Sequence, residues 1–200
     1  MAVAYGLGSL PFSVWIGKVF FRTDVREYGS GNAGATNTWR VLGWKAGLPV
    51  LLLDIGKGLA ATYLPCLHAS LDADPGLMLW MRILCGMAAA LGHIYPVFAG
   101  FHGGKAVATL LGVVVGLMPL AAAGSLLVFI LALLLSRMVS LGSILGAISL
   151  PFMSWLTPST GQLSLLFFSS VITILVILTH RRNIQRIFRG EESRVRFRKV

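Results

Sequence analysis

The chain has 200 residues, of which 56% are apolar and only 12% are charged. A soluble globular protein carries about 25% charged residues, so a soluble domain of this length could not bury its apolar side chains behind so few charges. Disorder is excluded because disordered chains are poor in apolar residues. The composition therefore predicts a membrane protein.

The charge is strongly basic, because 17 Lys and Arg stand against seven Asp and Glu and give a net charge of +10. In a soluble chain this excess would suggest nucleic acid, but beside long apolar stretches no nucleic acid partner is expected. Cys66 and Cys85 lie in apolar stretches and predict neither a disulfide nor a zinc site. The chain is apolar from Ala2, with no basic region before it, so a cleaved signal peptide is not expected.

Three apolar stretches in the first half of the chain are long enough to cross a bilayer, which takes about 20 residues. They cover 2–20, 46–67 and 76–95, and the polar segments that follow them cover 22–45, 68–75 and 96–105. The segment 68–75 is predicted to be a short turn that contains Asp72 and Asp74.

Residues 106–178 contain a single charge, Arg137. Two helices over this stretch would each approach ~55 Å in length, against a hydrocarbon core of ~30 Å. Four helices fit, with breaks at Pro119, at Arg137 and in the turn 157–162. An even number also leaves the Lys105 segment and the basic tail on one side. The sequence thus predicts an all-α polytopic membrane protein with seven transmembrane helices, two of them short, in a single membrane domain over 1–200.

The positions of Lys and Arg predict the orientation. The segments 68–75, 119–123 and 157–162, placed on one side, contain no Lys or Arg. The other side holds Arg22, Arg26, Arg40, Lys45, Lys105, Arg137 and the basic tail. Because basic segments stay in the cytoplasm, we expect the N-terminus outside and the C-terminus inside. The segments 22–45, 96–105 and 179–200 are then cytoplasmic loops and tail.

The first cytoplasmic segment contains the string GSGNAGATNTWR at 29–40. Its glycines let backbone N–H groups converge on an anion, and hydroxyl, amide and guanidinium groups add further donors. A flexible turn between helices is the alternative, although a connector does not require Asn32, Asn37 and Arg40. We therefore expect this segment to bind an anion.

In the second segment, Gly103, Gly104 and Lys105 lead directly into an apolar helix. Free N–H groups, the helix dipole and an ammonium group together suit a phosphate. The segment lacks the first glycine and the Ser or Thr of a Walker A motif, so nucleotide binding is not implied. The alternative is a capped helix start with Lys105 snorkelling to the interface.

The third segment begins at His180 and is expected to be helical, which puts His180 and Asn183 on one face. His180 can shuttle protons near neutral pH, whereas its arginine neighbours are explained as anchors to anionic lipid.

Four ionisable side chains lie inside the second and third predicted spans. Asp54 and Lys57, near the middle of the second span, either neutralise each other or serve function, with Lys57 expected to face a polar cavity. His93, near the cytoplasmic end of the third span, lines the site or contributes to packing. Arg82, near the outer end of that span, is expected to snorkel.

These residues resemble the motifs of the bacterial membrane glycerol-3-phosphate acyltransferases that use acyl-phosphate as donor. The resemblance covers nearly the whole chain, through GSLPFSVWIGK at 8–18, GSGNAGATNTWR at 29–40, DIGKG at 54–58, LGHIYPVFAGFHGGKAVAT at 91–109 and HRRNIQRIFRGEE at 180–192. The string SGNAGATN is its most specific part. The resemblance implies a seven-helix fold in the bacterial inner membrane with the active site facing the cytoplasm.

The resemblance also implies the reaction, which is acyl transfer from fatty acyl-phosphate to the sn-1 hydroxyl of glycerol 3-phosphate, giving lysophosphatidate and phosphate. It implies no acyl-CoA, no metal and no cofactor; membrane lipid and an acyl-phosphate-forming enzyme are the other expected partners. Together with the patterns above, it assigns catalysis to Ser30, Asn32, Arg40, His180 and Asn183, substrate or phosphate binding to Gly31, Thr36, Asn37, Lys57, Gly103, Gly104, Lys105 and Thr109, and structural roles to Asp54, His93 and Glu192.

Three positions depart from the family pattern. Position 106, usually Gly in the string Gly-Gly-Lys-Gly, is Ala, which is tolerated if its φ is negative. His102 stands where Lys is frequent and is expected to weaken the local positive field, and Arg182 stands where Glu is frequent, which excludes an acidic role there.

Two questions stay open from the sequence. The general base is either His180 or the substrate phosphate itself. The alternative function is a transporter or carrier of organic phosphates. Glycine loops on one face count against alternating access, whereas the Asp54/Lys57 pair keeps this alternative open.

Overall fold

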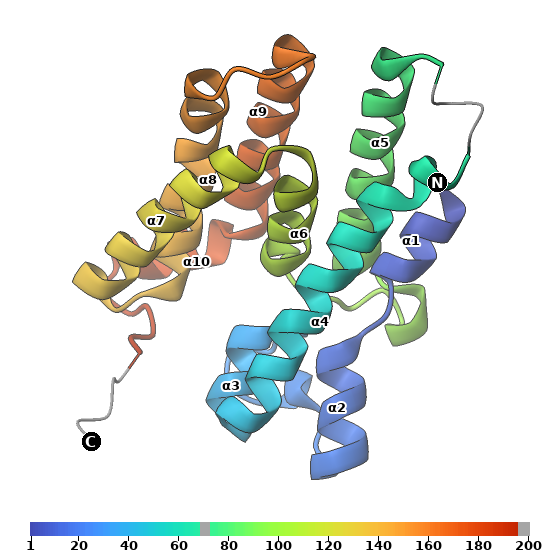
Figure 1. Ribbon diagram of the computed structural model, residues 1–200. Helices are drawn as coiled ribbons and strands as arrows, with labels where there is room; N and C mark the ends of the chain where they lie inside the picture. The colour runs from blue at the N-terminus through green and yellow to red at the C-terminus, as the bar shows by residue number, and fades with distance from the viewer. Residues whose placement is uncertain (69–72, 196–200) are drawn as a thin grey trace. The chain divides into compact units, whose positions relative to one another are not determined.

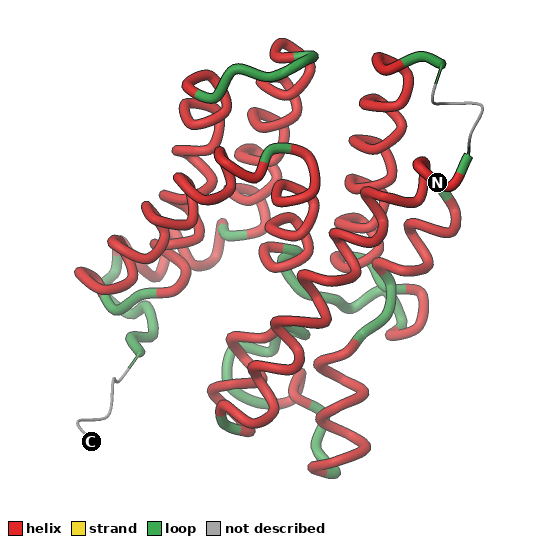
Figure 2. Tube along the Cα trace, in the orientation of Figure 1, coloured by secondary structure: helices red, strands yellow, loops and turns green. Residues whose placement is uncertain are grey.

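The computed structural model describes residues 1–68 and 73–195, which form helices and connecting loops without any strand (Figures 1 and 2). Asp72 and half of the predicted turn at 68–75 lie outside the described residues, as do residues 196–200 of the predicted cytoplasmic tail.

Contacts between helices divide the chain into two compact units, Met1–Leu117 and Met118–Val200. The helices of the first unit are α1 (Ala2–Gly8), α2 (Phe12–Phe21), α3 (Ala35–Leu42), α4 (Trp44–Tyr63), α5 (Pro75–Ile94) and α6 (Val107–Leu117). Those of the second are α7 (Pro119–Ser136), α8 (Val139–Leu156), α9 (Gln162–Thr179) and α10 (Arg181–Phe188). Short 3-10 helices cover Val25–Glu27, Leu64–Leu67 and Val97–Ala99.

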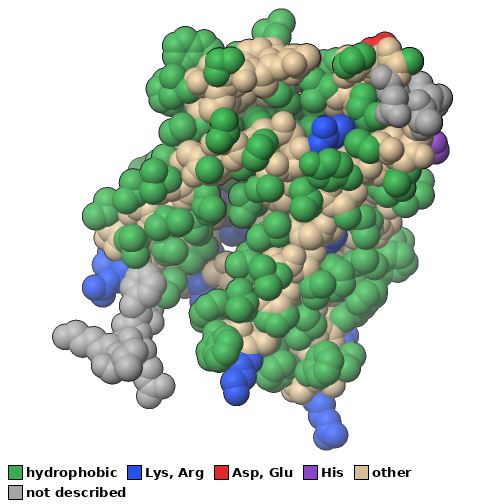
Figure 3. Space-filling model, in the orientation of Figure 1, with side chains coloured by type: hydrophobic (Ala, Val, Ile, Leu, Met, Phe, Trp, Pro, Cys, Tyr) green, Lys and Arg blue, Asp and Glu red, His purple; other side chains and the backbone are tan. Residues whose placement is uncertain are grey.

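Within the described residues, six segments are long and apolar enough to cross a bilayer: Ala2–Phe21, Trp44–Leu67, Pro75–Ala99, Pro119–Ser136, Val139–Leu156 and Gln162–Thr179. Hydrophobic side chains cover much of the face shown in Figure 3. The remaining predicted span is present as α6, but its 11 residues extend only about 16 Å, roughly half of the hydrocarbon core. The all-helical prediction is confirmed, whereas the count of seven and the orientation stay predictions.

The helix ends explain where the apolar stretches divide. Pro119 is the first residue of α7, a position that needs no N–H donor. Arg137 ends the same helix in the left-handed conformation, at φ 61°. The Asp74 carboxylate caps α5 by accepting from the N–H groups of Gly76 and Leu77 at 2.9 and 3.0 Å. The breaks predicted at Pro119, at Arg137 and within 157–162 are confirmed.

Helices α4 and α6 pack with their backbones in direct contact. A Cβ atom on Gly58 of α4 would overlap the carbonyl group of Thr109, and one on Gly112 of α6 would overlap the carbonyl group of Ile55. Small residues permit this close approach between apolar helices. The contact includes the first turn of α6, so the start of that helix is fixed against α4.

The other end of α6 is capped by Arg82 of α5. The Arg82 guanidinium donates to the Gly116 carbonyl at 2.6 Å and lies 4.7 Å from the centroid of the Tyr63 ring. The last carbonyl groups of a helix have no partner within it, and within a bilayer they require a donor from the protein. Arg82 supplies that donor, and its expected snorkelling to the interface stays a prediction.

The residue before α6, Ala106, adopts the left-handed conformation, with φ 59°, and is buried. The expectation that alanine is tolerated here required a negative φ, and the structure contradicts it. A residue with a Cβ atom is disfavoured in this region by about 1–2 kcal/mol, whereas glycine adopts it readily. The turn that carries Lys105 is therefore strained in this chain.

In the second unit, the Glu192 side chain joins α8 to α10. Its Oε1 accepts from Ser140 Oγ at 2.8 Å and from Asn183 Nδ2 at 2.7 Å, and its Oε2 accepts from Arg186 Nε at 2.8 Å. Burial raises the pKa of Glu192, but these three donors outweigh burial and hold the pKa below its ordinary value. The geometry supports the structural role expected of this residue.

We predict that Ala106→Gly stabilises the protein by about 1 kcal/mol, because glycine removes the strain of a left-handed alanine. Thermal unfolding of the detergent-solubilised protein measures the effect. Ala108→Gly, inside α6, is the matched control and should instead destabilise by about 0.5–1 kcal/mol. If both variants lose stability alike, Ala106 is not strained.

We predict that Glu192→Gln destabilises the protein by roughly 1–3 kcal/mol at pH 7, because Arg186, Asn183 and Ser140 lose a charged acceptor. Because the folded-state pKa lies below the ordinary 4.5, this contribution is complete well above pH 4.5 and declines as the pH falls below it. The difference in Tm between wild type and variant should shrink accordingly. Glu191→Gln, at an exposed position, is the control; an equal loss in both variants would contradict the prediction.

Candidate active site

The predicted site residues fall into two groups, one in each unit. The first unit holds Ser30, Gly31, Asn32, Thr36, Asn37, Arg40, Asp54, Lys57, His93, Gly103, Gly104, Lys105 and Thr109. The second unit holds His180, Asn183 and Glu192.

The segment 29–40 is a loop followed by a helix, which corrects the expectation of one glycine-rich loop. Gly34 precedes α3 as its N-cap, so Thr36, Asn37 and Arg40 lie on a helix. Ser30 and Asn32 lie in the loop and are partly exposed. A loop that ends at a helix N-terminus presents backbone N–H groups suited to an anion.

The Asn37 side chain shapes this loop. Its Oδ1 accepts from the Ser30 N–H at 2.9 Å, and its Nδ2 donates to the carbonyl groups of Val25 and Tyr28 at 2.7 and 3.1 Å. Asn37 is only 2% exposed, and it satisfies backbone groups that the turn would otherwise leave unpaired. Sequence assigned Asn37 to substrate binding, whereas in the structure both N–H groups of its amide are used within the loop.

An ion pair that no sequence motif signalled joins this loop to the second one. Asp24 Oδ2 lies 2.7 Å from Arg26 Nη2, and Arg26 Nη1 donates to the carbonyl of Ala99 at 3.0 Å. Hydrogen bonding from the Arg26 side chain is the main cause that holds the pKa of Asp24 well below its usual range. The pair is therefore charged at physiological pH and ties two segments 73 residues apart.

The second loop lies against His93. The Gly104 N–H donates to the His93 carbonyl at 3.1 Å. A Cβ atom on Gly103 would overlap the same carbonyl, and one on Gly104 would overlap the His93 ring and approach the carbonyl oxygen of Ala33 at 2.7 Å. Glycine is therefore required at both positions, and Lys105 follows directly, two residues before α6 begins at Val107.

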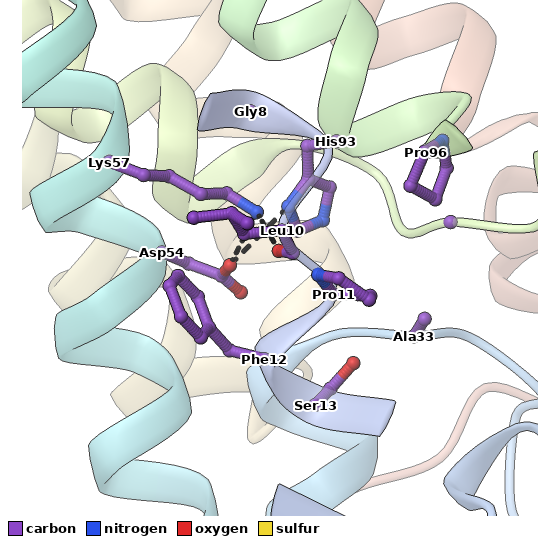
Figure 4. Close-up of a pocket in the computed structure, with 11 residues that line it drawn as sticks. Gly8, Leu10, Pro11, Phe12, Ser13, Ala33, Asp54, Lys57, His93 and Pro96 are labelled. Atoms are coloured by element: carbon purple, nitrogen blue, oxygen red, sulfur yellow. Dashed lines mark hydrogen bonds and ion pairs between the residues drawn. The ribbon is translucent and has the colours of Figure 1, made fainter. Parts of the chain in front are cut away.

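Behind this loop, four buried side chains form a polar array: Asp54, Lys57, His93 and Thr109. Lys57 Nζ lies 2.9 Å from Asp54 Oδ1 and donates to the Leu10 carbonyl at 2.9 Å (Figure 4). His93 Nδ1 lies 3.5 Å from Asp54 Oδ1 and 3.2 Å from Thr109 Oγ1.

Two members of the array, Lys57 and Thr109, are residues that the sequence assigned to substrate binding. The Lys57 side chain is 2% exposed and has its partners inside the unit, and Thr109 is fully buried against His93. The structural roles of Asp54 and His93 stay predictions. A cavity with room for about one water molecule lies between the array, Ala33 and Gly103.

In the second unit, His180 and Asn183 are both buried where α9 meets α10. His180 Nδ1 lies 2.9 Å from the Val176 carbonyl oxygen. Donation to this carbonyl places the proton of the neutral ring on Nδ1 and its basic lone pair on Nε2. The Asn183 amide donates to Glu192, which orients it. Among the described residues of both units, no three His, Cys, Asp or Glu side chains gather as metal ligands.

Comparison with known proteins identifies the family. The sequence model described as glycerol-3-phosphate acyltransferase matches residues 1–190. Proteins of that name from Enterococcus faecalis and Listeria monocytogenes are each 45% identical over 98% of this chain, covering 91% and 94% of their own lengths. The one from Chlorobaculum parvum is 41% identical over 98% of this chain and 95% of its own length.

Crystal structures of PlsY (YgiH), an integral membrane glycerol 3-phosphate acyltransferase, share the fold. Its glycerol 3-phosphate form matches with a TM-score of 0.85 at 40% identity, over 98% of this chain and 93% of that one. Its lysophosphatidic acid form matches with a TM-score of 0.81 at 39% identity, over 96% and 92%. Together with the six apolar helices, this likeness makes the chain a multi-pass membrane protein. The chain belongs to the glycerol-3-phosphate acyltransferase family.

Proposed function

We propose that this protein transfers the acyl group of a fatty acyl-phosphate to the sn-1 hydroxyl of glycerol 3-phosphate, giving 1-acyl-glycerol 3-phosphate (lysophosphatidate) and phosphate. The observation that carries the proposal is that two glycine-containing loops, each leading into a helix, lie together in the first unit, where Arg26 donates to Ala99 and Gly104 lies close to Ala33. Solved relatives in glycerol 3-phosphate and lysophosphatidic acid forms support it, and the motif resemblance supports acyl-phosphate as donor.

Phosphate recognition is the first task, because both substrates carry a phosphate group. The turn of Gly103, Gly104 and Lys105 precedes α6, whose first N–H groups and dipole attract an anion. The loop with Ser30 and Asn32 precedes α3, which carries Arg40. In this proposal the two loops receive the phosphate groups of the two substrates.

The chemistry needs no covalent intermediate, because acyl-phosphate is already an activated mixed anhydride. The sn-1 hydroxyl attacks the carbonyl carbon, the bond between that carbon and the bridging oxygen breaks, and phosphate leaves with its electron pair. In this proposal the Ser30 hydroxyl donates to the developing oxyanion. The two candidates for the proton acceptor stay those of the sequence, His180 and the substrate phosphate.

The membrane setting follows from the distribution of charge. We propose that α6 completes a seven-helix single membrane domain in the bacterial inner membrane, with the N-terminus outside and the C-terminus inside. Both loops and the tail that begins after Thr179 then face the cytoplasm, where Lys and Arg are retained. Acyl-phosphate and membrane lipid reach the site from the bilayer, and the proposed partner is an acyl-phosphate-forming enzyme.

A carrier of organic phosphates is the competing function. Its support was the Asp54/Lys57 pair, which as an exposed pair could have lined a transport path. Both side chains are 2% exposed and pair with each other. This burial counts against a carrier that would use the pair along a transport path.

The direct test is purified protein in lipid vesicles, supplied with palmitoyl phosphate and glycerol 3-phosphate and scored for lysophosphatidate. Ser30→Ala and Arg40→Ala should each lower kcat by about 10²–10³, as loss of one oxyanion donor does elsewhere (~2.7–4 kcal/mol). Ser159→Ala, in an exposed turn, is the control. Folded wild-type protein without product would favour the carrier, near-normal turnover in Ser30→Ala would remove the loop from catalysis, and trapped acyl-Ser30 would establish a covalent route.

We predict that Lys105→Ala raises the KM of one phosphate-bearing substrate by roughly ten- to a hundredfold, because a charge-assisted hydrogen bond to phosphate contributes about 1.5–3 kcal/mol. Steady-state kinetics with each substrate varied in turn measures the effect. Lys45→Ala removes an exposed charge near the start of α4 and serves as control. Unchanged KM values in Lys105→Ala would leave Lys105 as a lipid anchor.

A further inference from the structure

His93 contacts the turn that carries Lys105 through both its backbone and its ring. The His93 carbonyl accepts from the Gly104 N–H at 3.1 Å, immediately before Lys105. The His93 ring contacts Thr109 Oγ1 at 3.2 Å, in the first turn of α6. His93 therefore touches the chain on both sides of Lys105, although His93 and Lys105 are 12 positions apart.

Asp54 in turn orients the His93 ring. Its Oδ1 lies 3.5 Å from His93 Nδ1, the same ring nitrogen that Thr109 Oγ1 contacts at 3.2 Å, so the carboxylate and the hydroxyl both face this atom (Figure 4). Lys57 balances the Asp54 charge at 2.9 Å, which a buried carboxylate requires in an apolar environment. Without that balance Asp54 could not keep a charge at this depth.

The start of α6 cannot move independently of this array. A Cβ atom on Gly58 would overlap the Thr109 carbonyl group, so α4 and α6 are in backbone contact beside His93. Ala106, which lies between Lys105 and the start of α6, has the left-handed conformation, at φ 59°. A residue in such a conformation persists only where its surroundings determine it, and His93 together with Gly58 provides those surroundings.

We propose that Asp54, His93 and Thr109 are positioning residues that place Lys105 and the first N–H groups of α6 for a substrate phosphate group. They do not touch the substrate. The proposal rests on the proposed function and extends it, because it makes an array buried in the membrane domain responsible for affinity at a loop outside it. It also explains why Lys57 and Thr109 lie in binding motifs without exposed side chains.

The test is isothermal titration calorimetry of the full-length protein in detergent with two probes, glycerol 3-phosphate and inorganic phosphate. Thr109→Val keeps the side-chain shape and removes the hydroxyl, and Asp54→Asn removes the charge that orients His93. Each variant should lower the affinity for the same ligand whose binding Lys105→Ala weakens. The expected loss is roughly two- to tenfold, which corresponds to one hydrogen bond. Thr109→Ser should restore the affinity.

Thr62→Val is the matched control, because Thr62 is also fully buried and its hydroxyl donates at 2.9 Å to the Gly58 carbonyl, within its own helix α4. This control should leave both affinities unchanged whatever it does to Tm. Two results would overturn the proposal. One is that Thr109→Val binds with wild-type affinity the ligand whose binding Lys105→Ala weakens. The other is that Lys105→Ala binds both glycerol 3-phosphate and inorganic phosphate with wild-type affinity. If the assay in vesicles gives no lysophosphatidate while binding follows the expected pattern, the proposed reaction fails and the positioning array stands.

Discussion

The backbone contact between α4 and α6 is the constraint on which the first unit depends. Gly58 and Gly112 let the two helices approach until carbonyl groups occupy the space of side chains. At this distance Asp54 of α4 reaches His93 of α5, and His93 reaches Thr109 of α6. A larger residue at either glycine would separate the helices and break the array, because the clash in each case is with backbone.

Two charged side chains within the apolar helices of the first unit, Lys57 and Arg82, donate to polar groups of the protein itself, as a bilayer favours. Lys57 pairs with Asp54 and donates to the carbonyl of Leu10, at the break between α1 and α2. Arg82 donates to a carbonyl group at the end of α6, a helix too short to cross the bilayer. A half-length helix with a capped end places its N-terminus, and with it the phosphate turn, where the packing of α4 and α5 dictates.

Sequence predicted the helices well, because proline, a lone arginine and a polar turn interrupt the apolar stretch from 106 to 178. It predicted the location of the loops from glycine density and charge. It missed α3, whose Thr, Asn and Trp are weak helix formers. It also missed the Asp24–Arg26 ion pair, because the Ala99 carbonyl to which Arg26 donates is distant in sequence. The φ of Ala106 and the partners of Lys57 depend on how helices cross, which local patterns do not encode.

The central claim is that the buried array acts through the Lys105 turn, and a double-mutant cycle tests it most directly. Glycerol 3-phosphate affinity would be measured for Thr109→Val, Lys105→Ala and the double variant, with calorimetry. We predict a coupling of at least ~0.5–1 kcal/mol, because once Lys105 is absent its placement no longer matters. Effects that add within about 0.3 kcal/mol would show that Thr109 and Lys105 act independently and would contradict the claim.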